Sequence, residues 1–410
     1  MLLIKNKIED IGIYLIPLAF FFILISTALS NVFVALAVFA SAFKIIKNKK
    51  YYIIFSEKIF IYSFLLFALL FTSYFYTIGS NEDFYTVIKK YIKFLYIPII
   101  FYYIKYYCNK KKVLKYFIHG TTITLILSYL KYFEIFDFNS LYYFLESTNI
   151  AYVKDNIVNN SIIVFHNYII HGVILSFFSF VTFLLARKES DNLYYYLLSA
   201  LSFINIIFLN DSRTAYLIIL FLVILLVYKS IFPRKIFIYI VPLILLLFIT
   251  FGSAFDNISN RFAQLSSDME ISENENYVSS LGLRYLWLDN GINNILKNPF
   301  LGSGAGSFSK TMSQYLIQKK LLPEHKIAIT NNTHNEFVSI SSQIGLIGLL
   351  LYLLFNFAVY VKSRNDIISQ GIFATILISS LFNSIFYDNI LGLFFIMLIS
   401  LIANNDKEWI

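Results

Sequence analysis

The sequence has a single cysteine, Cys108, and few charged residues. One cysteine excludes an intramolecular disulfide and any metal site built from several cysteines. Charged residues make up 14% of the chain and hydrophobic residues 58%, whereas a soluble domain has about 25% charged and about 45–50% apolar residues. The shortage of charge therefore excludes an ordinary soluble protein and indicates that much of the chain lies in lipid.

The hydrophobic residues fall into blocks of the length that crosses a membrane. Because roughly 17–25 apolar residues span a hydrocarbon core of about 30 Å, we predict an all-α polytopic membrane protein with about twelve transmembrane helices. The first block is interpreted as a retained span, since its apolar run is too long for a cleavable signal and no small-residue cleavage site follows. The predicted spans are 11–29, 31–46, 59–78, 91–104, 113–133, 161–186, 193–209, 214–231, 235–255, 336–361, 368–386 and 388–404.

The basic residues indicate the orientation of these spans. An even number of spans places both termini on one side, and the segments on that side carry the larger share of the 33 Lys and Arg residues. The positive-inside preference therefore predicts cytoplasmic termini. The formal charge of +9 does not indicate a nucleic-acid partner, because the basic residues are spread between spans and form no continuous stripe.

One long segment, residues 256–333, separates the transmembrane blocks 1–255 and 334–410 and is predicted to face outward. Its stretch LRYLWLDNGINNILKNP follows a helical period and ends at Asn298 and Pro299. FSKTMSQYLIQKKLLP predicts a second amphipathic helix on the membrane surface. As the only sizeable extramembrane segment, this loop is expected to carry the chemistry. The apolar stripe of its first helix comprises Tyr285, Leu288, Ile292, Ile295 and Leu296.

His334 stands in NNTHNEFV, just before the tenth predicted span, where Asn332 or Thr333 is placed to cap the helix. The positive end of a helix disfavours an imidazolium, so this histidine is expected to stay neutral, which is the form that a general base needs. The alternative is a polar residue at a helix entrance with no chemical role.

Two arginines are expected on the same outer face. Arg213, in NDSRTAYL, begins the eighth span, and Arg284, in GLRYLW, lies in the long loop. Guanidinium groups match phosphate oxygens bidentately, although an arginine at a membrane boundary also serves by snorkelling to the lipid headgroups. Two arginines and a histidine that come from three separate segments and share one face indicate a functional site more strongly than any of them alone.

Other polar residues carry weaker signals. His166 and His171 are rivals to His334, but their spacing of five does not make an i, i+4 metal pair, and no other cluster has ligand spacing, so we predict no metal site. Asp388, in the last short outer turn, is a simple turn residue or orients a donor or an arginine. The glycines of NPFLGSGAGSF follow no strand, which argues against a nucleotide-binding loop and for a turn that brings the backbone close to the site.

The sequence resembles the O-antigen ligase family, within a wider group that includes O-antigen polymerases. His334 and Asn335, then nine residues, then Gly345, two residues and Gly348 fit that family's pattern of His-Asn, nine residues and Gly-x-x-Gly. DSRTAYL, the run from LRYLW through NPFLGSGAGSF, and THNEFV also occur in the family's order.

The resemblance implies a GT-C-type glycosyltransferase of the bacterial inner membrane that needs no metal or cofactor and acts at the periplasmic face with inversion. Its donor would be an undecaprenyl-pyrophosphate-linked glycan and its acceptor a lipid A-core sugar. His334 would remove the proton from the acceptor hydroxyl, and Arg213 and Arg284 would hold the pyrophosphate and stabilise its developing charge. Asn335 and Asp388 are weaker candidates for the same site.

Two alternatives remain beside the ligase. An O-antigen or capsule polymerase would use the same donor with a different acceptor, and the complete His-Asn to Gly-x-x-Gly spacing favours the ligase. A transporter or flippase would suit the number of spans. However, the predicted spans are almost free of ionisable residues away from their ends, which argues against ion-coupled transport.

Overall fold

The computed structural model describes residues 13–135, 162–188, 192–229, 280–322, 325–404 and 409. Within these ranges, helices are the only regular elements. Lipid offers no hydrogen-bond partner to a bare backbone, so a spanning segment has to satisfy its own N–H and C=O groups as a helix. The all-α prediction is confirmed for this part of the chain. The predicted span 235–255 and residues 256–279 of the long loop lie outside the described residues.

In the part of the chain that the structure describes, five helices are long and apolar enough to cross a membrane, and several shorter apolar ones pack among them. The five are α3 (Thr27–Lys47), α4 (Lys58–Thr72) continued by η2 (Ser73–Phe75), α7 (Lys110–Tyr132), α9 (Tyr168–Lys188) and α16 (Glu336–Ser363). The shorter apolar helices are α10 (Leu193–Ile204) continued by η4 (Asn205–Leu209), α11 (Arg213–Tyr228), α17 (Ile367–Phe382) and α18 (Asn389–Ala403). The remaining elements are α2 (Leu15–Phe22), η1 (Tyr51–Phe55), α5 (Asn81–Tyr91), η3 (Ile92–Leu95), α6 (Tyr96–Tyr107), α14 (Ser280–Lys297), α15 (Phe308–Gln318) and η5 (Lys326–Ala328).

The first hydrophobic block differs from the expected single span over 11–29. Helix α2 has eight residues, which rise about 12 Å at 1.5 Å per residue, less than half of a hydrocarbon core. The chain then turns, and Ser26 caps α3 by accepting the Leu29 N–H at 3.3 Å. Twelve crossings therefore stay a prediction, while a polytopic membrane protein agrees with the five long apolar helices.

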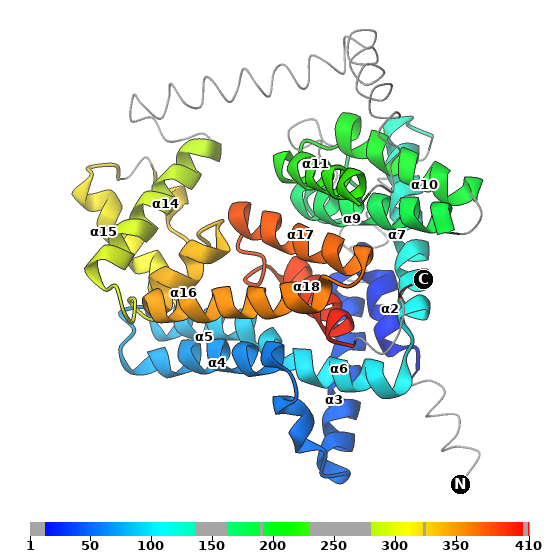
Figure 1. The fold of residues 1–410 in the computed structure, drawn as a ribbon. Coiled ribbons are helices and arrows are strands. Elements are labelled where there is room, and N and C mark those ends of the chain that lie inside the picture. The colour runs from blue at the N-terminus through cyan, green and yellow to red at the C-terminus, as the bar shows by residue number, and fades with distance from the viewer. Residues whose placement is uncertain are drawn as a thin grey trace.

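Helix α16 lies at the centre of the arrangement that positions the site (Figure 1). It packs along α4 on one side and α17 on another, and α14 from the long loop packs against it. Helix α18 is enclosed by its neighbours, with every residue from Ile390 to Ala403 buried. Helices α9, α10 and α11 pack together as a second group. This group contacts the helices around α16 because α11 and α9 both pack against α17.

The described part of the long loop forms the two predicted helices, α14 and α15, around a small core of its own that includes Trp287, Phe308 and Met312. Helix α14 ends at Lys297, directly before Asn298 and Pro299, as the sequence predicts. Its apolar stripe is on the outer surface, however, with Leu288 41% and Leu296 73% exposed. An exposed apolar stripe on an extramembrane helix suits contact with lipid.

Helix α16 is broken in its first half, and the break explains the first glycine of the Gly-x-x-Gly motif. Ile344 and Gly345 leave the helical conformation, and Gly345 has φ +66°. A Cβ atom at Gly345 would lie 2.1 Å from the Phe300 carbonyl oxygen. Only glycine fits a position that combines a left-handed backbone with so close an approach.

The glycine-rich turn 298–307 pairs with the backbone that this break exposes. The N–H groups of Ser303 and Gly304 donate to the carbonyls of Ser342 at 3.1 Å and Gln343 at 2.8 Å, and the Leu346 N–H donates to the Pro299 carbonyl at 2.7 Å. The turn therefore brings its backbone close to α16, and it satisfies polar groups that would otherwise be buried without partners.

We expect Gly345→Ala to lower the free energy of unfolding by about 2 kcal/mol or more, because the methyl group meets the Phe300 carbonyl and the backbone stays left-handed. Thermal unfolding of the purified protein in detergent measures the effect. Leu350→Ala, at a position 58% exposed farther along the same helix, is the control. Equal melting temperatures for the two variants would contradict the assignment.

Candidate functional site

His334 is the last residue but one before α16, and local hydrogen bonds fix its backbone. It has φ +51°, and its N–H donates to Asn332 Oδ1 at 2.9 Å. The helix cap is Asn335, whose Oδ1 accepts the Val338 N–H at 3.1 Å and whose Nδ2 donates to the Leu381 carbonyl at 2.9 Å. The expectation that Asn332 or Thr333 caps this helix is therefore wrong, because the left-handed turn at His334 moves the helix start to Glu336.

The imidazole of His334 stacks on the indole of Trp287. The ring centroids lie 4.5 Å apart, and the planes are inclined by 18°. Trp287 is itself fixed, since it is 8% exposed and its Nε1–H donates to the Ala328 carbonyl at 2.8 Å. The stack joins α14 of the long loop to the start of α16, so the imidazole is held by two segments far apart in the sequence.

Burial keeps His334 in its neutral form. Removal from water lowers the pKa of its imidazole to about 4, and the nearby charge of Arg284 acts in the same direction. A histidine with this pKa is unprotonated at neutral pH and holds a lone pair that can accept a proton. The sequence predicted a neutral His334 from the positive end of the following helix. In the structure the imidazole is neutral mainly because it is buried and because Arg284 is near.

The positive charges of Arg284 and Arg213 lie close enough to repel each other. Burial lowers the pKa of the half-buried Arg284, the phenol of Tyr168 raises it, and the positive charge of Arg213 lowers it. Arg213 is the first residue of α11, whose cap is Ser212, with its Oγ accepting the Ala215 N–H at 3.3 Å. Arg284 therefore lies within electrostatic range of both His334 and Arg213. The structure adds Tyr168, at the start of α9.

Two guanidinium groups whose charges repel each other favour binding an anion between them. Guanidinium forks suit an oxyanion with several oxygens, such as a phosphate or pyrophosphate. An imidazole that is unprotonated at neutral pH can accept the proton of a neutral hydroxyl. The arrangement can therefore bind a phosphorylated group and deprotonate a hydroxyl beside it.

A buried carboxylate, Glu336, anchors the segment that carries His334. It is fully buried, and it accepts the Tyr91 O–H at 2.8 Å and the Phe386 N–H at 2.9 Å. The first residue of a helix is a favourable place for an acidic side chain. These bonds tie the start of α16 to the end of α5 and to the turn before α18.

Asp388 caps α18. Its Oδ1 accepts the N–H groups of Ile390 and Leu391, both at 2.8 Å, which is a structural role for this side chain. Its carbonyl oxygen accepts a hydrogen bond from the Lys93 ammonium. A role for Asp388 in orienting a donor or an arginine stays a prediction.

A cavity of about 260 Å³ lies beside Asp388 and is lined also by Lys90 and Asn332. Lys90 Nζ donates to Asn389 Oδ1 at 2.8 Å. Burial lowers the pKa of Lys90, and the charge of Asp388 opposes that shift. Through Asn332, which accepts the His334 N–H, this cavity adjoins the turn that carries the imidazole.

The rival histidines are placed elsewhere. His171 is fully buried in α9, where its Nε2 lies 3.2 Å from Asn205 Oδ1. Asn205 in turn donates to Ser128 Oγ at 2.7 Å, which makes this a polar contact between helices. His166 lies against the backbone of Ile23. Among the described residues, no group of three His, Cys, Asp or Glu side chains is arranged to hold a metal ion.

Three features of the site escaped prediction from the sequence. Trp287 lies three residues after Arg284, and this spacing places the two side chains close together on one helix. The spacing could have indicated that Trp287 belongs to the same site. Lys90 belongs to the segment 79–90, which is expected to face outward against the positive-inside preference, and Lys93 lies near the start of the predicted span 91–104. Glu336 had no signal, since its partners Tyr91 and Phe386 are distant in the sequence.

Residues 197–353 match the family model described as O-antigen ligase. The matched region contains Arg213, Arg284, Trp287 and His334 and extends beyond Gly348, so the family resemblance is confirmed on the segment that carries the motifs. No curated protein matches the chain significantly.

We expect Trp287→Ala to raise the pKa of His334 from about 4 toward its ordinary value near 6.5, because removing the indole lets water reach the imidazole. NMR titration of the ¹⁵N-histidine-labelled protein measures it, with His334→Asn identifying the signal. The chain's other tryptophan supplies a matched control, Trp409→Ala. An unchanged pKa in Trp287→Ala would show that the stack does not shield His334.

Proposed function

This chain carries an O-antigen ligase family region over residues 197–353, and on that basis we propose that it transfers a glycan from an undecaprenyl-pyrophosphate-linked donor to a sugar hydroxyl of lipid A-core. The proposed enzyme is an inverting GT-C-type glycosyltransferase of the bacterial inner membrane, with its site at the periplasmic face and both termini in the cytoplasm. The observation that carries the proposal is the imidazole of His334, which is held against Trp287 at the start of α16 with Arg284 nearby.

In the proposed step, an imidazole nitrogen of His334 accepts the proton of the acceptor hydroxyl. The hydroxyl oxygen then forms a bond to the anomeric carbon of the donor sugar. The bond from that carbon to the pyrophosphate oxygen breaks, and its electron pair leaves with undecaprenyl pyrophosphate. Attack from the face opposite the leaving group inverts the anomeric centre. The imidazolium afterwards returns its proton to solvent.

The two arginines suit the leaving group of this reaction. Pyrophosphate departs as an anion, so it needs nearby cations more than it needs a general acid. A guanidinium group is always charged, and one such group can bind two oxygens of a phosphate at once. In this assignment Arg213 and Arg284 bind the donor, Asn335 fixes the turn that presents the base, and Asp388 fixes the adjoining helix. No metal or cofactor takes part in the step.

The acceptor distinguishes a ligase from a polymerase. Both enzymes would use His334 and the two arginines on the same donor. The ligase assignment is supported by the family description and by the complete spacing from His334 and Asn335 to Gly345 and Gly348. An analysis of the glycan products therefore decides between the two.

Deletion of the gene, followed by gel electrophoresis of the lipopolysaccharide, tests the proposal. Loss of all O-antigen from lipid A-core, with polymer accumulating on the lipid carrier, is the result expected of a ligase. A core that bears one repeat unit would identify a polymerase instead. An unchanged glycan pattern would refute both activities.

Complementation of that deletion with variants tests the mechanism. We expect His334→Ala to reduce transfer by about 10²-fold or more, because the step loses its base. Arg213→Lys and Arg284→Lys should each reduce it by about ten-fold or more, because lysine keeps the charge and loses the fork. Lys310→Ala, at an exposed position of α15, is the control. Membrane insertion is checked by immunoblotting, and full activity of inserted His334→Ala would refute the base assignment.

The pH dependence of the reaction rate should show that donor binding raises the pKa of His334. Because the neutral form of His334 is active and its pKa is about 4, kcat/KM should rise with pH through about 4 and then stay level. Bound pyrophosphate neutralises the charge of Arg284, which removes one cause of the low pKa. The acid limb of kcat, which reports the bound state, should therefore lie at higher pH than that of kcat/KM. Steady-state rates in proteoliposomes measure both, and coincident limbs would contradict this coupling.

A further inference from the structure

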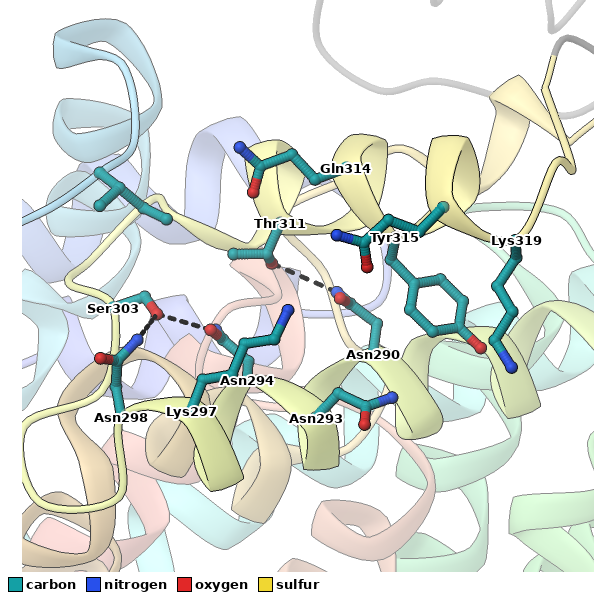
Figure 2. Close-up of a pocket in the computed structure, with 12 residues that line it drawn as sticks. Asn290, Asn293, Asn294, Lys297, Asn298, Ser303, Thr311, Gln314, Tyr315 and Lys319 are labelled. Atoms are coloured by element: carbon teal, nitrogen blue, oxygen red, sulfur yellow. Dashed lines mark hydrogen bonds between the residues drawn. The ribbon is translucent and has the colours of Figure 1, made fainter.

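A polar cavity of about 370 Å³ lies between α14, α15 and the glycine-rich turn 298–307. Figure 2 shows its lining side chains, which come from both helices and from the turn. In a chain that is 58% hydrophobic, this lining is unusual, since Ile78 is its only residue without a polar side-chain group. Six of the lining residues are amides: Asn290, Asn293, Asn294, Asn298, Gln314 and Gln318.

Part of this lining forms a fixed wall. Ser303 Oγ donates to Asn294 Oδ1 at 2.5 Å and accepts from Asn298 Nδ2 at 3.1 Å, and Asn290 Nδ2 donates to Thr311 Oγ1 at 3.3 Å (Figure 2). These bonds join α14 to the turn and to α15. A binding site needs such a second layer of contacts to hold its ligand-facing groups in place.

Other lining residues are accessible. Gln314, Gln318, Lys297 and Lys319 are exposed. Asn293 is half-buried, and its Nδ2 donates to Asp289 Oδ1 at 3.3 Å. Each amide offers two N–H donors and an acceptor oxygen. A sugar hydroxyl likewise both donates and accepts, so a row of amides suits a polyhydroxylated ligand. The cavity has no acidic lining residue, and its two lysines also admit sugars that carry a carboxylate.

The same helix connects this cavity to His334. Trp287, which stacks on the imidazole, is followed by Asn290 and Asn294 at the spacings that keep residues on one helix face. Asn293 lies six residues beyond Trp287, a rise of about 9 Å, and Lys297 lies ten residues beyond it, a rise of about 15 Å. The cavity therefore begins about 9 Å along the axis of α14 from the stacked pair, a distance of a few sugar units.

We propose that the cavity between α14 and α15 is a glycan subsite, which binds sugars several positions away from the one that reacts. This inference rests on the proposed glycosyl transfer, since His334 defines which sugar reacts. The bound glycan belongs either to the lipid-linked donor or to the core acceptor, and the chemistry of recognition is the same for both. Binding remote sugars contributes affinity that holds the reacting groups in position.

The test is the double variant Asn293→Ala with Gln314→Ala, assayed in proteoliposomes. Its donors carry either one repeat unit or a long polymer. A lost hydrogen bond changes affinity by about two- to ten-fold. We therefore expect KM for the long donor to rise about ten-fold, while kcat and KM for the one-unit donor stay unchanged. The matched control is Lys310→Ala, on the same helix and outside the cavity lining.

The acceptor arm uses intact and truncated lipid A-core. If the variant raises KM for intact core and leaves KM for truncated core and for both donors unchanged, the bound glycan is the acceptor. Unchanged KM values for both donors and both acceptors, with full activity, would overturn the subsite and leave the proposed function intact. Absence of transfer by the unmodified protein would instead refute the proposed function.

A binding measurement separates the subsite from catalysis. Saturation-transfer NMR with polysaccharide released from the host's lipopolysaccharide by mild acid should give a signal with the unmodified protein and with His334→Ala. The signal should fall several-fold with the double variant. Equal signals from the double variant and the unmodified protein would also overturn the subsite.

Discussion

The backbone pairing between the glycine-rich turn 298–307 and the break in α16 determines the geometry of the rest of the site. A helix broken inside a protein exposes carbonyl and N–H groups that are costly to bury alone. Here the turn supplies partners to Ser342, Gln343 and Leu346. Because the turn directly follows α14, this pairing also fixes α14 against α16, and so it places Trp287 against His334.

Burial shifts the pKa values of the ionisable groups in the site, and it also lowers the stability of the folded protein. Placing an imidazole and a guanidinium away from water disfavours their charged forms, and Arg284 and His334 add mutual repulsion whenever both are charged. The surrounding structure offsets this cost with neutral hydrogen bonds, notably those of Trp287 and Asn335 to carbonyls. Glu336 contributes in the same way, because its carboxylate oxygens accept from Tyr91 and Phe386.

Hydropathy predicted the helical class correctly because lipid imposes one solution on the backbone. The helical period also located α14 and α15, and motif order selected a histidine and two arginines, of which Arg284 lies within electrostatic range of the other two. Local patterns could not give the partner of His334, since stacking on Trp287 depends on how a loop folds back onto a helix. They also failed for the cap of α16. Asn332 and Thr333 are good capping residues, and only the left-handed backbone at His334 transfers that role to Asn335. Hydropathy alone also joined α2 to the residues after it, because a turn between apolar residues leaves no change in composition.

The exposed apolar stripe of α14 has a consequence for where the reaction takes place. One side of this helix contacts His334 through Trp287, and the opposite side presents Leu288, Ile292 and Leu296 outward. If that side rests in the bilayer interface, the membrane sets the height of the indole and hence of the base. The lipid–water boundary then aligns the site with the depth of a carrier lipid's headgroup, and this alignment holds in bilayers of different thickness.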